Sequence, residues 1–295
     1  MRRETIEKLI HSTFFTIALV SILILALICF FLFREGLPLF ETASVTGFLF
    51  GSYWYPTYDP PSFGILPLIV ASISVTLLSS LIAIPLGVMT AIYLAEIASP
   101  RLRGFLKPII ELLAALPSVV IGFFGMVVVA PFLQDTLNVW VGYNLFNAAL
   151  MLAFMSVPTI CSISEDAIYS VPRELKEASL ALGATHWQTI YRVIVPASIT
   201  GICTATILGM SRAIGETMVV LMVAGGAAGF PTSIFDPVRP MPASIAAEMG
   251  ETPFGSDHYH ALFAIGIVLF VLTLVFNIVA DYIAEKNKQI GSATL

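Results

Sequence analysis

Charged side chains are scarce in this chain of 295 residues. Only 11% of the residues are Asp, Glu, Lys or Arg, whereas 58% are hydrophobic. Several apolar runs exceed the roughly 18 to 20 residues that a helix needs to cross a bilayer, and a soluble domain would not carry so many of them. The composition therefore predicts an all-α polytopic membrane protein in contact with lipid. The net charge of −5 says little, because in a membrane protein the distribution of charge matters more than the sum. We expect no nucleic-acid partner.

Cysteine is also rare, and no zinc-ligand spacing is present. Cys29, Cys161 and Cys203 lie in or beside apolar segments, which is typical of small buried side chains rather than of a disulfide framework. His258 and His260 lie near Asp257, where a metal site is conceivable but a solvated loop is the better interpretation. No Walker A loop occurs, so the chain cannot bind ATP in that way. We expect no metal and no cofactor on this chain.

Hydropathy predicts six membrane spans, with boundaries set by the ends of the apolar runs. The first run follows a basic start and is too long for the apolar core of a signal peptide, so we expect an uncleaved span. Pro85 interrupts the second run, which is then either one tilted, kinked helix or two short helices. The predicted spans are 12–33, 64–97, 106–132, 143–163, 193–223 and 261–281.

Basic residues determine the expected orientation. Six spans with the N-terminus inside leave only Arg34 and Arg239 on the outside, and splitting the second span would move the later basic loops outward. The positive-inside rule, by which Lys and Arg gather in cytoplasmic loops, therefore favours six spans with both termini in the cytoplasm. The aromatic residues of the outer loops are interpreted as an interfacial belt, and segment 225–253 as irregular or partly re-entrant. These aromatics are Trp54, Tyr55, Tyr58 and Trp140.

Two opposite charges interrupt the fifth span. Arg212 and Glu216 are four residues apart, a spacing that places both side chains on one face of a continuous helix. A charge in hydrocarbon costs several kcal/mol, so such residues usually face a bundle interior or a translocation path. We expect the two residues to pair with each other in the resting state, which limits that cost.

A second face of the same span carries small residues at steps of four. It lies about 100° from the charged face, because adjacent residues differ by one helical step. Such a face allows close helix packing while its neighbour faces a cavity. The small residues are Gly201, Ala205, Gly209, Ala213 and Thr217.

The inner end of the third span carries a further acidic residue. Glu111 follows Lys107 by four residues, so an ion pair between them near the interface is the leading interpretation. A gating role remains open, because Glu111 begins a segment that ends with Pro117 and Ser118, and prolines that kink helices often mark moving parts of transporters.

The inner segment 164–196 differs from the other loops. Pro172 suits the first turn of a helix, Gly183 suits the position after its last turn, and Thr185 with Gln188 forms a capping box that starts a second helix. The first helix is amphipathic but too short to span a membrane. We therefore expect it to need a protein partner, and its mixed charges argue against an interfacial helix on lipid.

This segment resembles the permease subunits of bacterial ABC importers. Their signature is Glu-Ala-Ala, three residues, Gly, nine residues, an aliphatic residue, one residue, another aliphatic residue and Pro. Here Ser179 replaces the second Ala. The resemblance implies a MetI-like permease fold in which the loop docks on an ATPase subunit. The positions in register are Glu177, Ala178, Ser179, Gly183, Val193, Val195 and Pro196, with Ala184 beside the glycine.

Further segments narrow the likeness to the phosphate-specific, PstC-type permeases, with the PstA type still possible. They are 33–38, 111–118, 122–125 and the Arg-Ala-Ile-Gly-Glu-Thr-Met block 212–218. The resemblance implies a phosphate pathway shared with a second permease subunit, an ATPase that holds ATP and Mg, and an outer phosphate-binding protein. We expect Arg212, Glu216, Ser211 and Thr217 to line the pathway. Arg supplies hydrogen-bond donors for the anion, and Glu216 would accept a hydrogen bond from protonated phosphate, which sulfate does not offer.

The expected organisation is a first helix with its outer loop over 1–63, a permease core over 64–283 and a cytoplasmic tail over 284–295. A bacterial inner-membrane location follows. A permease for sulfate, molybdate or tungstate is the alternative within the same class. An ion-coupled secondary transporter or channel would fit the intramembrane charges, but such proteins often show internal repeats of spans, and none is evident. An intramembrane enzyme lacks a nucleophile–base pair or metal motif here.

Overall fold

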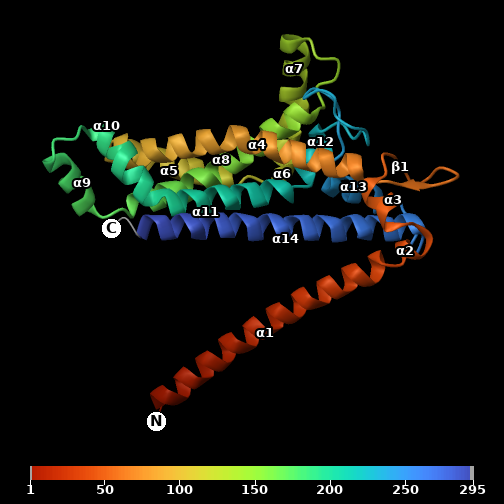
Figure 1. Ribbon diagram of the computed structural model, residues 1–295, viewed down its shortest axis with the longest axis horizontal. Coiled ribbons are helices and arrows are strands. Elements are labelled where there is room, and N and C mark those ends of the chain that lie inside the picture. Colours follow the sequence, from red (N-terminus) through yellow and green to blue (C-terminus); the bar gives the residue numbers. More distant parts are fainter. Residues whose placement is uncertain (1, 293–295) are drawn as a thin grey trace.

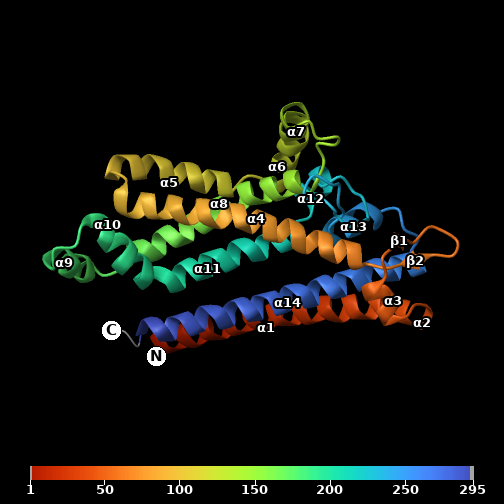
Figure 2. The ribbon, with the colours of Figure 1, turned by 45° about the horizontal axis from the view of Figure 1, so that its top comes forward.

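The computed structural model describes the backbone of residues 2–292 and the side chains of residues 7–280 and Tyr282. Helices dominate, and six of them are long and apolar enough to cross a membrane, as predicted. The spans 66–97, 145–169 and 186–214 pack against one another, with α14 along one side (Figures 1 and 2). The spans are Glu7–Thr42, Leu66–Ile97, Ser118–Leu137, Leu145–Tyr169, His186–Ile214 and Asp257–Ala280.

The helices that build these spans are α1 (Arg2–Gly36), α4 (Leu66–Ile92), α6 (Ser118–Phe124), α7 (Ala130–Leu137), α8 (Leu145–Tyr169), α10 (His186–Thr189), α11 (Val195–Ile214) and α14 (Asp257–Ser292). Three π-helical turns join consecutive pieces: η1 (Tyr93–Ile97), η2 (Gly125–Val129) and η3 (Ile190–Ile194). The remaining elements are α2 (Leu39–Thr42), α3 (Val45–Phe50), β1 (Trp54–Tyr55), β2 (Ser62–Phe63), α5 (Pro100–Ala114), α9 (Arg173–Ala181), α12 (Met218–Val223) and α13 (Met241–Glu248).

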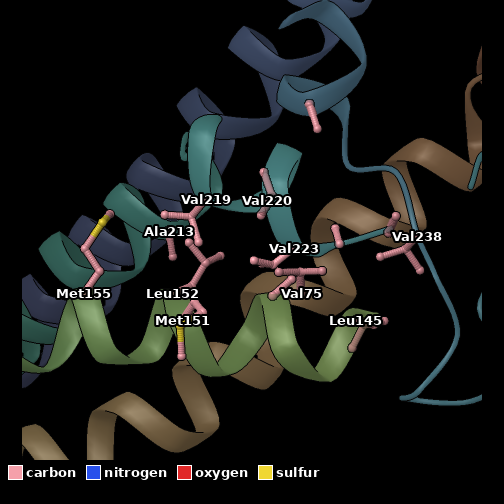
Figure 3. Packing of buried hydrophobic residues seen from close by; sticks show 14 of the residues in the cluster. Val75, Leu145, Met151, Leu152, Met155, Ala213, Val219, Val220, Val223 and Val238 are labelled. Atoms are coloured by element: carbon pink, nitrogen blue, oxygen red, sulfur yellow. The ribbon is translucent and has the colours of Figure 1, made fainter. Parts of the chain in front are cut away.

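Helices α4, α8 and α11 form the centre of the bundle. Small residues allow their close approach: a Cβ atom at Gly87 of α4 would lie 2.7 Å from Cγ2 of Ile160 in α8. Toward the outer end, α12 closes the same core, where Val219 and Val223 are completely buried. Figure 3 shows Val75 of α4, Leu152 of α8 and the valines of α12 pointing toward one another. Pro85, inside α4, leaves this helix unbroken, so the second span is one helix.

Among its described side chains, helix α1 packs against the rest of the chain near its C-terminal end. There, the rings of Phe31 and Phe263 meet edge to face at 5.6 Å, and His260 Nδ1 lies 2.7 Å from the carbonyl oxygen of Glu35. A Cβ atom at Gly36 would clash with Ile267 of α14. From that end α1 diverges from α14 (Figure 1), and none of its membrane window is buried.

The third span differs from the prediction of one helix over 106–132. Its apolar crossing is Ser118–Leu137, and residues 106–114 belong to α5, a separate amphipathic helix that packs against α8 (Figure 2). The break falls at Pro117, whose backbone is extended (φ −59°, ψ 136°) and which lacks the N–H needed to continue the helix. The hydropathy pattern does not reveal this break, because the residues on both sides of Pro117 are apolar.

Two residues of the predicted outer loops, Trp54 and His258, make buried contacts that were not predicted. Trp54 is 2% exposed, and its Nε1 donates to the carboxylate of Glu248 at 3.1 Å, so the belt interpretation is wrong for this residue. Glu248 also lies 2.7 Å from His258 Nε2 and contacts Arg239, so His258 is not in a solvated loop. Segment 225–253 is largely irregular, as predicted.

This segment also folds back into the bundle. Val238 and Met241 are fully buried, and the Met241 N–H donates to Ser72 Oγ of α4 at 2.8 Å. An irregular segment can lie at this depth only because protein atoms satisfy its backbone.

Candidate functional site

Arg212 lies in the last turn of α11, with its side chain exposed on the outside of the subunit. It forms no ion pair within the part of the chain that the structure describes. A guanidinium group carries five N–H donors and no acceptor. Arg212 therefore offers donors and positive charge, without a counter-ion from its own subunit, at the end of a membrane span.

Glu216 does not share a helix face with Arg212, which corrects the prediction of a continuous helix over 193–223. Helix α11 ends at Ile214, and Gly215 terminates it in a bridge conformation (φ −90°, ψ 0°). The low helix propensity of glycine favours an end at this position. The predicted resting ion pair with Arg212 is also absent from the described residues.

The carboxylate of Glu216 instead caps the start of α12. Its Oε1 accepts hydrogen bonds from the backbone N–H groups of Met218 at 3.2 Å and Val219 at 3.3 Å. Negative charge at a helix start is favourable, because the first N–H groups have no partner within the helix. The acid and the base thus flank the break between α11 and α12, one on each side.

Ser211 and Thr217, the other predicted pathway residues, also lie on opposite sides of this break. Ser211 Oγ donates to Asn277 Oδ1 of α14 at 2.5 Å, and Thr217 Oγ1 donates to the carbonyl oxygen of Gly215 at 3.3 Å. The role of Asn277 was not predicted from the sequence. A side-chain amide within the apolar run of α14 was the signal that could have identified it.

The small-residue face of α11 packs against α8, as predicted for its first four members. A Cβ atom at Gly201 would lie 2.3 Å from Cβ of Ala167, and one at Gly209 would lie 2.6 Å from Cγ1 of Ile160. Thr217 is not part of this face, because the helix has already ended. A neighbouring side of α11, about 100° from this face, stays exposed at Thr204, Leu208 and Arg212.

The inner loop has the predicted form of a helix, a turn and a second helix. Pro172 directly precedes α9, and Gly183 follows the helix end with φ +84°, a conformation that glycine adopts without strain. Thr185 and Gln188 form the expected capping box at the start of α10. Helix α10 continues through η3 into α11, with Pro196 in the first turn of α11. The loop is therefore continuous with the helix that carries Arg212.

Two contacts, one from α9 and one from α10, attach this loop to the bundle, and the sequence predicted neither. The ammonium group of Lys176 contacts the carboxylate of Glu96 in η1, and His186 Nε2 lies 3.3 Å from the carbonyl oxygen of the same residue. Ser179, which replaces the second alanine of the signature, has its hydroxyl 3.0 Å from that of Thr189. The loop is thus held at a defined place on the inner end of the bundle.

The outward surface of the loop is apolar and uncovered. Leu182 is 89% exposed, and Trp187 is 62% exposed. The signature residues Glu177 and Ala178 are exposed beside them, and Ala184 N–H donates to the carbonyl oxygen of Ser179 in the turn. The loop projects from one end of the bundle (Figure 1), and large exposed apolar side chains at such a place are typical of a protein-binding surface.

The predicted pair between Lys107 and Glu111 is wrong. Lys107 Nζ lies 2.6 Å from Glu165 Oε2 and 2.8 Å from Asp166 Oδ1, both in α8. Arg103 contacts the same Glu165, whose side chain is only 1% exposed. These pairs fix α5 to α8.

The residues assigned to a possible gate are more accessible. Glu111 is exposed and lines a cavity of about 680 Å³ at the inner end, together with Arg103 and Lys107. Pro117 and Ser118 mark the break between α5 and α6. Their role as a gate stays a prediction.

Comparison with known proteins gives one consistent result. The family model described as "Binding-protein-dependent transport system inner membrane component" matches residues 83–289. The chain is 41% identical over 273 residues to the "Probable ABC transporter permease protein YqgH" of Bacillus subtilis, covering 92% of this chain and 88% of that protein. It is 32% identical to the "Phosphate transport system permease protein PstC" of Mesorhizobium japonicum, covering 95% and 90%.

Solved structures agree on the fold. A chain of the MetNI methionine ABC transporter in an inward-facing conformation is similar with a TM-score of 0.59 at 20% identity, covering 74% of this chain and 93% of that one. A chain of a bacterial alginate ABC transporter is similar with a TM-score of 0.61 at 18% identity, covering 91% and 94%.

Proposed function

Because the chain belongs to the family of binding-protein-dependent transport system inner membrane components, it is a multi-pass inner-membrane permease subunit of an ABC importer, and we propose that its substrate is phosphate. The observation that supports this substrate is the exposed guanidinium group of Arg212 at the end of a membrane span, without a counter-ion among the described residues of its own chain. Relatives named as phosphate permeases, at 31–32% identity over most of the chain, agree with it.

Phosphate is a strongly hydrated oxyanion, and its transfer requires donors that replace water. The planar donor group of Arg212 matches two phosphate oxygens at once. Glu216 has one carboxylate oxygen bound to backbone N–H groups, which leaves the other able to accept from the protonated oxygen of phosphate. Sulfate has no such proton near neutral pH, so this acceptor favours phosphate.

An importer of this class contains an ATPase, a substrate-binding protein and a second permease subunit. We propose that these are of the PstB, PstS and PstA types. In this arrangement the chain binds no cofactor and performs no catalysis itself, and ATP with Mg is bound by the ATPase. Both termini then lie in the cytoplasm with the loop of α9 and α10, whose exposed Leu182 and Trp187 contact the ATPase.

Uptake of labelled phosphate by vesicles that contain the full complex tests the substrate. Arg212→Gln removes the charge and is expected to reduce uptake to background, whereas Arg212→Lys keeps the charge without the planar donors and retains a fraction. Arg34→Gln is the matched control, because Arg34 is an exposed arginine outside the proposed pathway. Normal phosphate uptake by an assembled Arg212→Gln complex would refute the pathway. Competition by sulfate, molybdate or tungstate equal to that of unlabelled phosphate would assign the chain to another oxyanion.

A further inference from the structure

Helix α14 carries a polar residue within its membrane span. Asn277 lies in the apolar span Asp257–Ala280, with Val275 and Ile278 beside it, and its side chain is exposed on the outside of the subunit. A side-chain amide in contact with hydrocarbon is costly, so such a residue usually faces a protein partner or a water-filled path. Such a position is more typical of a helix face against protein or water than of one against lipid.

The amide of Asn277 is held in one orientation by α11. Ser211 Oγ donates to Asn277 Oδ1 at 2.5 Å, so the oxygen of the amide points to Ser211 and the Nδ2 group points away from it. Within the described chain, no acceptor faces the two N–H groups of Nδ2. Ser211 thereby presents two oriented donors on the exposed side of the α11–α14 pair.

The residue that holds this amide is the chain neighbour of Arg212. Ser211 and Arg212 are adjacent on α11, and their side chains diverge by about 100° across its uncovered side. Arg212 and Asn277 thus contribute only N–H groups to this surface, and the hydroxyl of Ser211 is already committed to the amide. A surface that offers donors and positive charge, without an acceptor from these groups, suits an oxyanion and disfavours a cation.

We propose that Asn277 is a second anion-binding residue of the pathway and that Ser211 is its positioning residue. The inference rests on the proposed function and adds α14 to the helices that line the route. The amide donates one hydrogen bond to an oxygen of the passing phosphate while Arg212 holds two others. Because the amide is neutral, it replaces lost water without binding the anion so tightly that release is slow.

The test compares two substitutions of Asn277 in the full complex, with phosphate concentration varied in vesicle uptake. Asn277→Ala removes the donors and is expected to lower Vmax/KM about tenfold, the cost of one hydrogen bond to a charged group. Asn277→Asp keeps the shape but adds a carboxylate that repels phosphate and attracts Arg212, so its loss is larger. A purely structural role predicts the reverse order, because Asp preserves the volume and the acceptor for Ser211. Ser211→Ala is expected to give a smaller loss than Asn277→Ala.

Thr273→Ala is the matched control, since Thr273 lies one turn earlier on α14 and its hydroxyl donates to the carbonyl oxygen of Phe270 in its own helix. It is expected to transport phosphate like the unaltered complex. If Arg212→Gln abolishes uptake while both Asn277 variants remain normal, the proposed function stands and this inference is wrong. If Asn277→Ala no longer co-purifies with the second permease subunit, the amide serves a subunit contact, which also overturns the inference. If the unaltered complex imports no phosphate, both fail.

Discussion

Lys176 of helix α9 is paired with Glu96, the acidic residue of η1 at the inner end of the second span. The carboxylate is 5% exposed and the lysine side chain 25% exposed, so the two partners differ in their access to water. The pair joins two segments that are 80 residues apart in the sequence. It determines where the loop lies on the bundle, and therefore how a displacement of the loop reaches α11.

Breaking this pair from its two sides is expected to have unequal effects. Lys176→Met leaves a buried carboxylate without its partner and should destabilise the complex by about 3 kcal/mol, whereas Glu96→Gln leaves a lysine that can turn to solvent and should cost less. The double variant should be more stable than Lys176→Met alone. Thermal unfolding of the purified complex measures the stabilities, and phosphate-stimulated ATPase activity measures coupling. Arg101→Gln is a control, since Arg101 is exposed at the inner side. Equal losses from both single variants would contradict a buried ion pair.

Gly183 is expected to be needed for its backbone conformation alone. Its φ is +84°, and a Cβ atom there would have no neighbour within 4 Å. Gly183→Ala should therefore cost about 1 kcal/mol from strain and weaken co-purification with the ATPase, whereas Gly183→Asn should be tolerated better, since asparagine enters this region more readily. Gly104→Ala is the control, because Gly104 has equally open space and no positive φ. Similar effects of Ala and Asn at position 183 would show that something other than strain matters.

Tight packing between α11 and α8 predicts that added volume is poorly tolerated. Gly209→Val would push a side chain into Ile160, and the expected loss of stability is about 1–3 kcal/mol, with a lower yield of folded protein. The control is Gly229→Val, because a Cβ atom at Gly229 has no neighbour within 4 Å. Thermal unfolding in detergent gives the comparison. Equal stability of the two variants would mean that the helices separate easily.

Glu248 organises the outer loops and should be essential to their order. It accepts from Trp54, contacts Arg239 and lies 2.7 Å from His258 Nε2. Glu248→Ala removes all three contacts and is expected to cost about 1–3 kcal/mol and to expose Trp54 to water, which shifts its fluorescence to longer wavelength. Glu251→Ala is the control, because Glu251 is an exposed carboxylate three residues later. An unchanged tryptophan spectrum in Glu248→Ala would show that the hairpin of β1 and β2 is held by other contacts.

Features that depend on residues close together in the sequence were predicted correctly. The capping box at Thr185, the glycine after α9 and the small-residue face of α11 follow from backbone and packing preferences of nearby residues, and the structure confirms them. The six spans also follow, because bilayer thickness sets their length.

Features that depend on residues far apart in the sequence are harder to predict from it. The breaks at Pro117 and Gly215 lie within apolar runs, where hydropathy carries no signal of an end. Lys107 was assigned to Glu111 by spacing, but it pairs with α8, 59 residues away, because a buried Glu165 there competes for it. Trp54 was assigned to the membrane interface by its residue type. In the structure it is buried, and its indole N–H donates to the carboxylate of Glu248, 194 residues later.

The break between α11 and α12 at residues 215–217 provides a hinge between the two helices. Helix α12 is fixed in the core by Val219 and Val223, which are fully buried, whereas α11 continues directly from the loop of α9 and α10. In the proposed transport cycle, a rotation of α11 that starts at this loop would be taken up at residues 215–217. Such a rotation would turn Arg212, one turn before the break, together with α11. The proposed pathway would then reorient its cation while the core around α12 keeps its packing.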